Sequence, residues 1–177
     1  MSMIREGRVW AFGDRVGIET ISPLKYMYEP ADRGRRCLEQ ADPAFGANVR
    51  SGDLLIAGAL FGHGPGHDHA NLAIKEAGIV GVIAHSFGPQ FFRHSIDHGL
   101  LIAECSDILQ IAASGDIVRI DFSTGNLHNL SRGTSARARV PKGPAAEIVA
   151  AGGLMPFIRA QLADGFRSGS GPTKCIS

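Results

Sequence analysis

The residues with the clearest chemical potential lie in one short stretch that is rich in glycine and histidine. Residues 61–70 read FGHGPGHDHA, with three histidines and three glycines between positions 62 and 69. A glycine-rich turn that leads into a helix presents free backbone N–H groups, which bind anions. Histidine adds a general base, because its ordinary pKa of about 6.5 lies near neutral pH. The stretch therefore predicts a site that holds a carboxylate and moves a proton.

Separate roles are predicted for the residues of this loop. His67 is the candidate base and, when protonated, a partner for a carboxylate, and His63 is a second catalytic candidate that approaches the same space. Asp68 is predicted either to orient a histidine or to occupy the first turn of a helix, where a carboxylate is favoured. His69 is expected to fix the loop through hydrogen bonds. The predicted substrate-binding residues are Gly62, Gly64, Pro65, Gly66, His67 and Asp68.

A metal site is a second interpretation of the same histidines. His63, His67 and His69 form an H-x3-H-x-H pattern, which is sterically possible for zinc or iron. The spacing matches no strong zinc signature, so the leading prediction is that this chain binds no metal or other cofactor by itself. The cysteines are Cys37, Cys105 and Cys175. They are too far apart in the sequence to form a zinc or iron–sulfur motif by themselves.

The sequence around the loop predicts strands and helices in alternation. Apolar runs predict strands at 3–12, 54–58, 79–86 and 100–105. Helices are predicted at 35–41, 67–77, 89–99, near 144–151 and then to about 162, and a hairpin is predicted at 116–130. The order strand, helix, strand, helix, strand implies parallel pairing with right-handed crossovers. Proline at position 65 is expected to cost little, because the first N–H groups of a helix have no partner.

Composition indicates one globular domain. The chain has 177 residues, 44% apolar and 20% charged, with a formal net charge of +1. We expect a single domain over 1–162 and a flexible C-terminal tail over 163–177. A near-neutral charge argues against nucleic acid or a membrane surface as partner, and no apolar run reaches membrane-spanning length. Sparse cysteines and the lack of a signal-peptide pattern favour the cytoplasm.

Several motifs in order resemble the small subunit of the isopropylmalate dehydratase family, which corresponds to the swivelling C-terminal domain of aconitase. The matching segments are GRVWAFGDRV, ISPLKYM, GDLLIAGALFG, HANLAIKEAGIVGVIAHSF, FFRHSIDHGL and EIVAAGGLMPFI. The resemblance covers nearly the whole chain. It implies an α/β fold of the aconitase swivel type, with β/β/α layers and a mixed sheet whose parallel strands are joined by crossover helices.

The resemblance also implies a function. It implies a heteromeric hydro-lyase, or dehydratase, in which a separate large subunit holds a [4Fe–4S] cluster that acts as a Lewis acid on a hydroxy-carboxylic acid. The loop of that family usually reads Gly-x-Gly-Ser-Ser-Arg-Glu-His-Ala, with the first serine as base and the arginine as carboxylate clamp. Here Pro65 and Gly66 stand at the two serine positions, His67 at the arginine and Asp68 at the glutamate. The family's Asp-Thr-Asp before Ile-x-Pro is replaced by residues 17–19, Gly-Ile-Glu.

These replacements leave three hypotheses open. The first is a dehydratase small subunit whose substrate is not the family's standard one. The second is a non-catalytic paralogue that serves as a scaffold or regulatory partner. The third is a stand-alone histidine–metal protein. The retained glycines favour the first hypothesis, since a loop without function needs neither glycine nor histidine.

Overall fold

The first strand of the chain lies at the centre of a seven-stranded sheet. The computed structural model describes residues 3–26 and 28–167. Strand β1 (Ile4–Phe12) pairs in parallel with β2 (Leu54–Ala57) and antiparallel with β5 (Ile117–Asp121). The strand order is β4-β3-β2-β1-β5-β6-β7. The sheet therefore changes from parallel to antiparallel pairing at β1.

The parallel half contains the crossovers that the sequence predicts. Strands β2, β3 (Gly81–Ala84) and β4 (Ile102–Glu104) are parallel, and helices α4 (His69–Glu76) and α5 (Pro89–Asp97) connect them. Every residue of β2 and β3 is buried, as expected for strands covered on both faces. The predicted strands and crossover helices are confirmed here.

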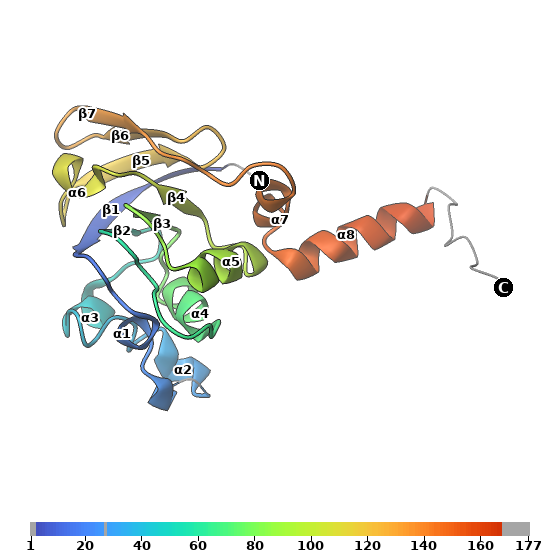
Figure 1. Cartoon of the computed structure of the whole chain (residues 1–177), viewed down its shortest axis with the longest axis horizontal. Helices are drawn as coiled ribbons and strands as arrows, with labels where there is room; N and C mark the ends of the chain where they lie inside the picture. The colour runs from blue at the N-terminus through green and yellow to red at the C-terminus, as the bar shows by residue number, and fades with distance from the viewer. Residues whose placement is uncertain (1–2, 27, 168–177) are drawn as a thin grey trace.

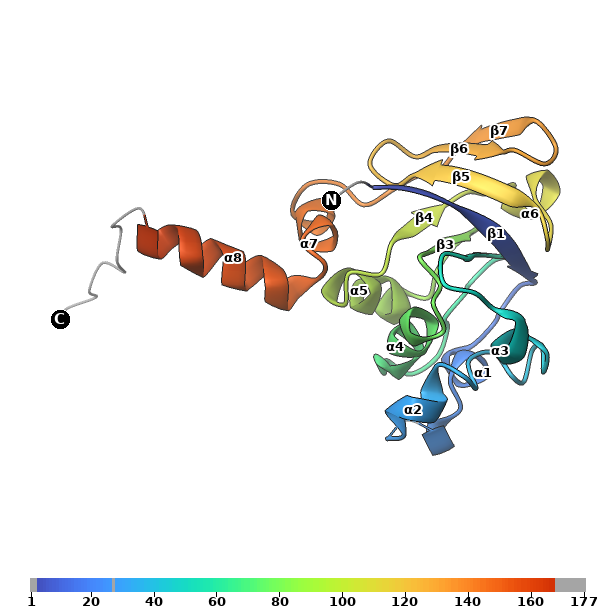
Figure 2. The ribbon, with the colours of Figure 1, turned by 180° about the vertical axis from the view of Figure 1, so that it is seen from behind.

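Two hydrophobic cores lie on opposite faces of the parallel strands. Along β1 the side chains alternate, so that Val9 packs in one core while Trp10 and Phe12 pack against the other. Helices α4 and α5 cover one face, and the antiparallel strands curl over the other (Figures 1 and 2). The result is the β/β/α layering that the resemblance implies.

The antiparallel half consists of β5, β6 (Asn126–Asn129) and β7 (Thr134–Arg137). The predicted hairpin at 116–130 is confirmed by the pairing of β5 with β6. β7 was not predicted, because its four residues are polar or small and only one of them is even partly buried. After β7 the chain returns to β4, where the backbones of Glu104 and Arg139 exchange two hydrogen bonds.

Asp53, in the turn before β2, ties this turn to β1. Its carboxylate accepts hydrogen bonds from Arg8 at 2.9 Å, the Trp10 indole at 2.8 Å and the Arg50 backbone N–H at 3.0 Å. Burial acts to raise the pKa of Asp53, but these hydrogen bonds outweigh it and hold the pKa below its ordinary value. The carboxylate therefore stabilises the fold in its charged form.

The remaining helices are short, except for the last. They are α1 (Ile18–Ile21), the 3-10 helix η1 (Leu24–Tyr26), α2 (Pro30–Arg33), α3 (Phe45–Asn48), α6 (Ile108–Ile111), α7 (Pro144–Ala150) and α8 (Leu154–Arg167). The predicted helix at 35–41 is wrong. Consecutive turns occupy that segment, and Leu38 adopts a positive φ of 58°, which a right-handed helix cannot contain.

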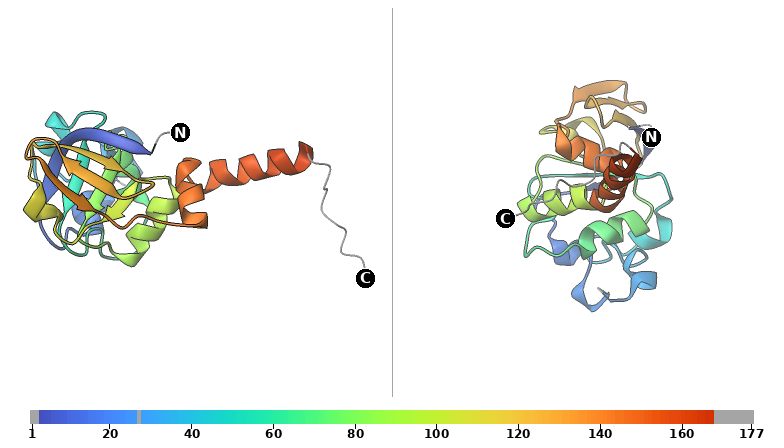
Figure 3. Two further views of the ribbon diagram at one scale, coloured as in Figure 1. Left: turned by 90° about the horizontal axis from the view of Figure 1, so that it is seen from above. Right: turned by 90° about the vertical axis from the view of Figure 1, so that its right-hand side faces the viewer.

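Helix α8 projects from the body of the molecule, and only its start lies near α5 and α7 (Figure 3). It continues to Arg167 instead of ending near residue 162, while residues 168–177 of the expected tail lie outside the described residues. Met155, Ile158 and Leu162 are exposed apolar side chains on this helix. Within the described chain, no helix combines the length and apolar character needed to cross a membrane.

Candidate functional site

The glycine–histidine loop lies at the carboxyl edge of the parallel strands, where three loops meet. Its residue His63 forms a β-bridge with Gly17, in the loop after β1, and Phe61 forms one with Phe87, in the loop after β3. The bridges are held by short backbone hydrogen bonds, including 2.7 Å from the Gly62 N–H to the Val16 carbonyl. Ligand sites in open α/β sheets form at this edge.

Gly62 anchors the loop to the core. Its φ is +73°, and a Cβ atom there would lie 2.3 Å from Cγ of Phe91. Phe91 is fully buried, and its ring makes an edge contact with the ring of Phe61 at a centroid distance of 5.3 Å. Glycine is therefore required at position 62 by both backbone conformation and packing. The exposed part of the loop begins directly after this anchor.

Residues 64–68 of the loop are all exposed. The backbone N–H groups of Gly64, Gly66 and Asp68 have no hydrogen-bond acceptor among the described residues. Helix α4 begins at His69, so the predicted start at residue 67 is wrong, although the predicted stop is confirmed by Gly78 with φ +92°. A tight turn, closed by a hydrogen bond from the His67 N–H to the Pro65 carbonyl, precedes the helix and delays its start.

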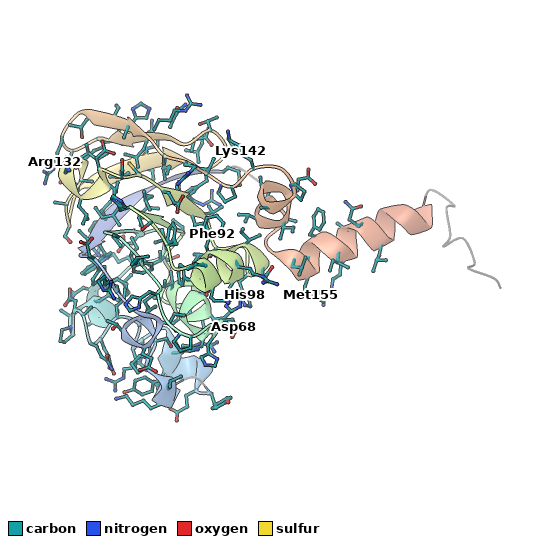
Figure 4. All side chains as sticks on the ribbon, in the orientation of Figure 1. Asp68, Phe92, His98, Arg132, Lys142 and Met155 are labelled. Carbon is teal, nitrogen blue, oxygen red and sulfur yellow. The ribbon has the colours of Figure 1, made fainter. Side chains whose placement is uncertain are left out.

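The structure places Asp68 at the N-cap of α4, but its side chain does not cap the helix. Its carboxylate instead lies 3.1 Å from Nε2 of His98, at the C-cap of α5 (Figure 4). The His98 carbonyl in turn accepts a hydrogen bond from the Lys75 ammonium. Asp68 therefore orients His98 rather than His67.

The three loop histidines have different surroundings. His63 is half-buried, and its Nε2 lies 2.9 Å from the Arg15 carbonyl. His69 is almost completely buried, with Nε2 3.1 Å from the Ser22 carbonyl. His67 is exposed, and its ring centroid lies 5.5 Å from that of His69. Two histidines are thus fixed by backbone carbonyls, and the third is open to a substrate.

The geometry does not join these histidines into a metal site. Two separate backbone carbonyls hold their Nε2 atoms. The Arg15 carbonyl holds His63, and the Ser22 carbonyl holds His69. Among residues 3–26 and 28–167 no group of three or more histidine, cysteine, aspartate or glutamate side chains is placed to hold a metal ion. The alternative of a metal site formed by His63, His67 and His69 therefore has no support in the observed geometry.

The two described cysteines are also unsuited to bind a metal or cluster. Cys37 and Cys105 are buried free thiols, and Cys175 lies outside the described residues. Burial raises the pKa of Cys37 far above its ordinary value and raises the pKa of Cys105 to about 11. Both thiols are therefore inert and inaccessible, and neither belongs to a group of side chains placed to hold a metal ion within the described part of the chain.

Layering, strand order and the position of the loop define this chain as a swivelling domain of the aconitase type. Residues 24–108 match the family model of the aconitase C-terminal domain. The crystal structure of 3-isopropylmalate dehydratase from Methanocaldococcus jannaschii superimposes with a TM-score of 0.90 at 33% sequence identity. That comparison covers 94% of this chain and 100% of the other.

Curated relatives are similar over almost their whole length. The 3-isopropylmalate dehydratase small subunit of Heliobacterium modesticaldum is 37% identical over 90% of this chain and 97% of its own. The isopropylmalate/citramalate isomerase small subunit of Methanocaldococcus jannaschii is 36% identical over 93% of this chain and 99% of its own. The chain belongs to the family of isopropylmalate dehydratase small subunits.

Proposed function

We propose that this chain is the small subunit of a hydro-lyase that dehydrates and rehydrates a hydroxy-carboxylic acid together with a separate large iron–sulfur subunit. The observation that carries the proposal is the loop at residues 62–69, with its free N–H groups and its exposed histidine. Every residue from 64 to 68 is open to solvent, so the chain alone has no walls to exclude water from a reaction there. A partner subunit that closes over this loop supplies those walls.

Dehydration requires a base for the carbon-bound proton and a group that holds the substrate carboxylate. His67 is the base in this proposal, because it is exposed and its side chain makes no hydrogen bond among the described residues. The N–H groups of Gly64, Gly66 and Asp68 hold the carboxylate, supported by the first turn of α4. His63, fixed against the Arg15 carbonyl, borders the same space.

The iron–sulfur cluster is assigned to the partner, because Cys37 and Cys105 are buried and no group of side chains among the described residues is placed to hold a metal ion. An open iron of such a cluster supplies a Lewis acid for the departing hydroxide. This chain contributes the base, the carboxylate seat and part of the wall around the substrate. Free buried thiols suit a reducing compartment, and we accordingly place the complex in the cytoplasm.

The substrate in this proposal differs from the standard substrates of the family. The usual arginine clamp binds a carboxylate through two parallel hydrogen bonds, whereas the imidazole of His67 offers a single directed one. Pro65 carries neither a hydroxyl nor an N–H group. The loop therefore suits a hydroxy acid whose carboxylate is bound mainly by backbone N–H groups.

The test is purification of the tagged chain from its own host under anaerobic conditions, followed by identification of the proteins that accompany it. A large iron–sulfur protein in equal amount supports the proposal and supplies the complex for a screen of hydroxy acids. Within the active complex, His67→Ala is expected to lower kcat by about 100-fold or more, as for removal of a general base. His128→Ala, in the distant strand β6, is the matched control.

Each outcome is informative. Turnover that survives His67→Ala removes His67 from the role of base. An inactive complex that still contains the large subunit favours the non-catalytic paralogue, as the loss of the serine and arginine also does. A chain that never associates with an iron–sulfur protein refutes the hydro-lyase proposal.

A further inference from the structure

His69 lies directly beneath the exposed loop and carries a nitrogen that no protein group uses. His69 is only 1% exposed, and its Nε2 lies 3.1 Å from the Ser22 carbonyl. A carbonyl can only accept a hydrogen bond, so Nε2 carries the hydrogen. In the neutral ring Nδ1 is then an unprotonated acceptor. This Nδ1 atom is buried and has no hydrogen-bond partner within the described residues.

The ring of His69 is kept neutral by its surroundings. Burial is the largest influence on its pKa and lowers it, the hydrogen bond to the Ser22 carbonyl acts in the opposite direction, and the nearby His67 lowers it again. The net result is a pKa below the ordinary histidine value. Nδ1 therefore retains its lone pair at neutral pH and remains ready to accept a hydrogen bond.

His67 is a neighbouring group able to supply that hydrogen bond. The two ring centroids are 5.5 Å apart, with an angle of 42° between the ring planes. The His67 side chain is exposed and free to change rotamer, so one of its ring nitrogens can turn toward Nδ1 of His69. The carboxylate of Asp68 cannot fill this role, because it only accepts hydrogen bonds, and it is paired with His98.

We propose that His69 is a positioning residue for His67, in a chain of hydrogen bonds that runs from the Ser22 carbonyl through His69 to His67. The N–H of His67 that faces His69 donates to Nδ1, which fixes the tautomer of His67. Its other nitrogen is then unprotonated and faces the open side of the loop. Such an arrangement recurs in active sites: a second group orients the nucleophile or base, and a third group orients the second.

The consequence for the reaction rests on the proposed function, in which His67 is the base. The outer nitrogen of His67 takes the proton as the C–H bond breaks, and the electron pair of that bond forms the carbon–carbon double bond while hydroxide leaves. The positive charge on His67 strengthens its hydrogen bond to His69. No proton passes to His69, which orients the base and stabilises its charged form.

The experiment is nitrogen NMR on the isolated full chain labelled with 15N-histidine, which requires no partner subunit. Above the pH at which the histidines are charged, the 15N shifts are expected to show one tautomer for His67 and a coupling across the hydrogen bond to Nδ1 of His69. His69→Phe is expected to abolish the tautomer preference, whereas His128→Gln, on the distant β6, leaves it unchanged. A His67 that gives the averaged shifts of a free imidazole in the unaltered chain overturns the proposal.

Two further measurements separate the possible failures. If His69→Phe does not fold, the shifts and the coupling in the unaltered chain decide the question alone. In a reconstituted complex, His69→Gln keeps an N–H for the Ser22 carbonyl but removes the ring. We expect it to lower kcat at least tenfold with little change in KM, while a purely structural role for His69 predicts unchanged kcat. An inactive complex refutes the proposed function without affecting the NMR result.

Discussion

Replacing Gly62 with alanine tests whether packing against Phe91 fixes the glycine–histidine loop. The new Cβ would lie 2.3 Å from Cγ of Phe91, a separation at which the ring must move. The positive φ costs an L-residue about 1–2 kcal/mol, and overpacking a filled core costs about 1–3 kcal/mol more. We therefore expect Gly62→Ala to lower the free energy of unfolding by about 2–5 kcal/mol.

Gly133 provides the matched control. Its φ of +69° is close to the +73° of Gly62, but a Cβ there meets nothing within 4 Å. Gly133→Ala should therefore cost only the conformational part, about 1–2 kcal/mol. Gly13→Ala, which has neither a positive φ nor a neighbour within 4 Å, should cost less than about 0.5 kcal/mol.

Thermal unfolding of the isolated chain, followed by circular dichroism or calorimetry, measures these differences. For a domain of this size each kcal/mol shifts Tm by about 2–4 °C, so Gly62→Ala should lower Tm by roughly 4–20 °C. If Gly62→Ala and Gly133→Ala destabilise equally, the Phe91 ring moves without cost. The inference that packing against the core fixes the loop would then be wrong.

Three further predictions concern other parts of the chain. Because the folded pKa of Asp53 is lowered, its stabilisation is present above the unfolded value of about 3.9 and lost as the pH falls through the folded pKa. Asp53→Asn should therefore weaken the loss of unfolding free energy at acid pH, measured by chemical denaturation at a series of pH values, and cost about 1–3 kcal/mol at pH 7. An unchanged loss at acid pH would assign that loss to other groups. Cys37 and Cys105 should resist thiol reagents in the native chain and react only in denaturant, as peptide mass spectrometry can determine. Leu162→Lys, at a side chain 61% exposed, should leave Tm within about 2 °C of the unaltered chain while raising the temperature at which light scattering begins.

The parallel half of the fold could be predicted from sequence because its signals are local. Continuous apolar runs mark β2 and β3, and glycines end both crossover helices. The helices α1, α3 and α6 could not be predicted, since single turns of four residues are too short to show a helical period. How the antiparallel strands curl over the parallel ones depends on contacts between distant residues.

The loop itself could be found from sequence, but the surroundings of its side chains could not. The carbonyl groups of Arg15 and Ser22 hold His63 and His69, and every residue has such a carbonyl, so residue type gives no signal. The pairing of Asp68 with His98 depends on how α4 packs against α5.

The position of β1 has a consequence for how the chain folds. Both neighbours of this strand lie far along the chain from it: Ile4 pairs with Asp121 on one side and Val9 pairs with Leu54 on the other. Pairing between such distant segments is slow, because the loop between them must close first. The β5-facing edge of β1 therefore stays unpaired until the chain through Asp121 has left the ribosome. A sheet whose central strand must wait for a partner so distant in sequence is expected to form cooperatively.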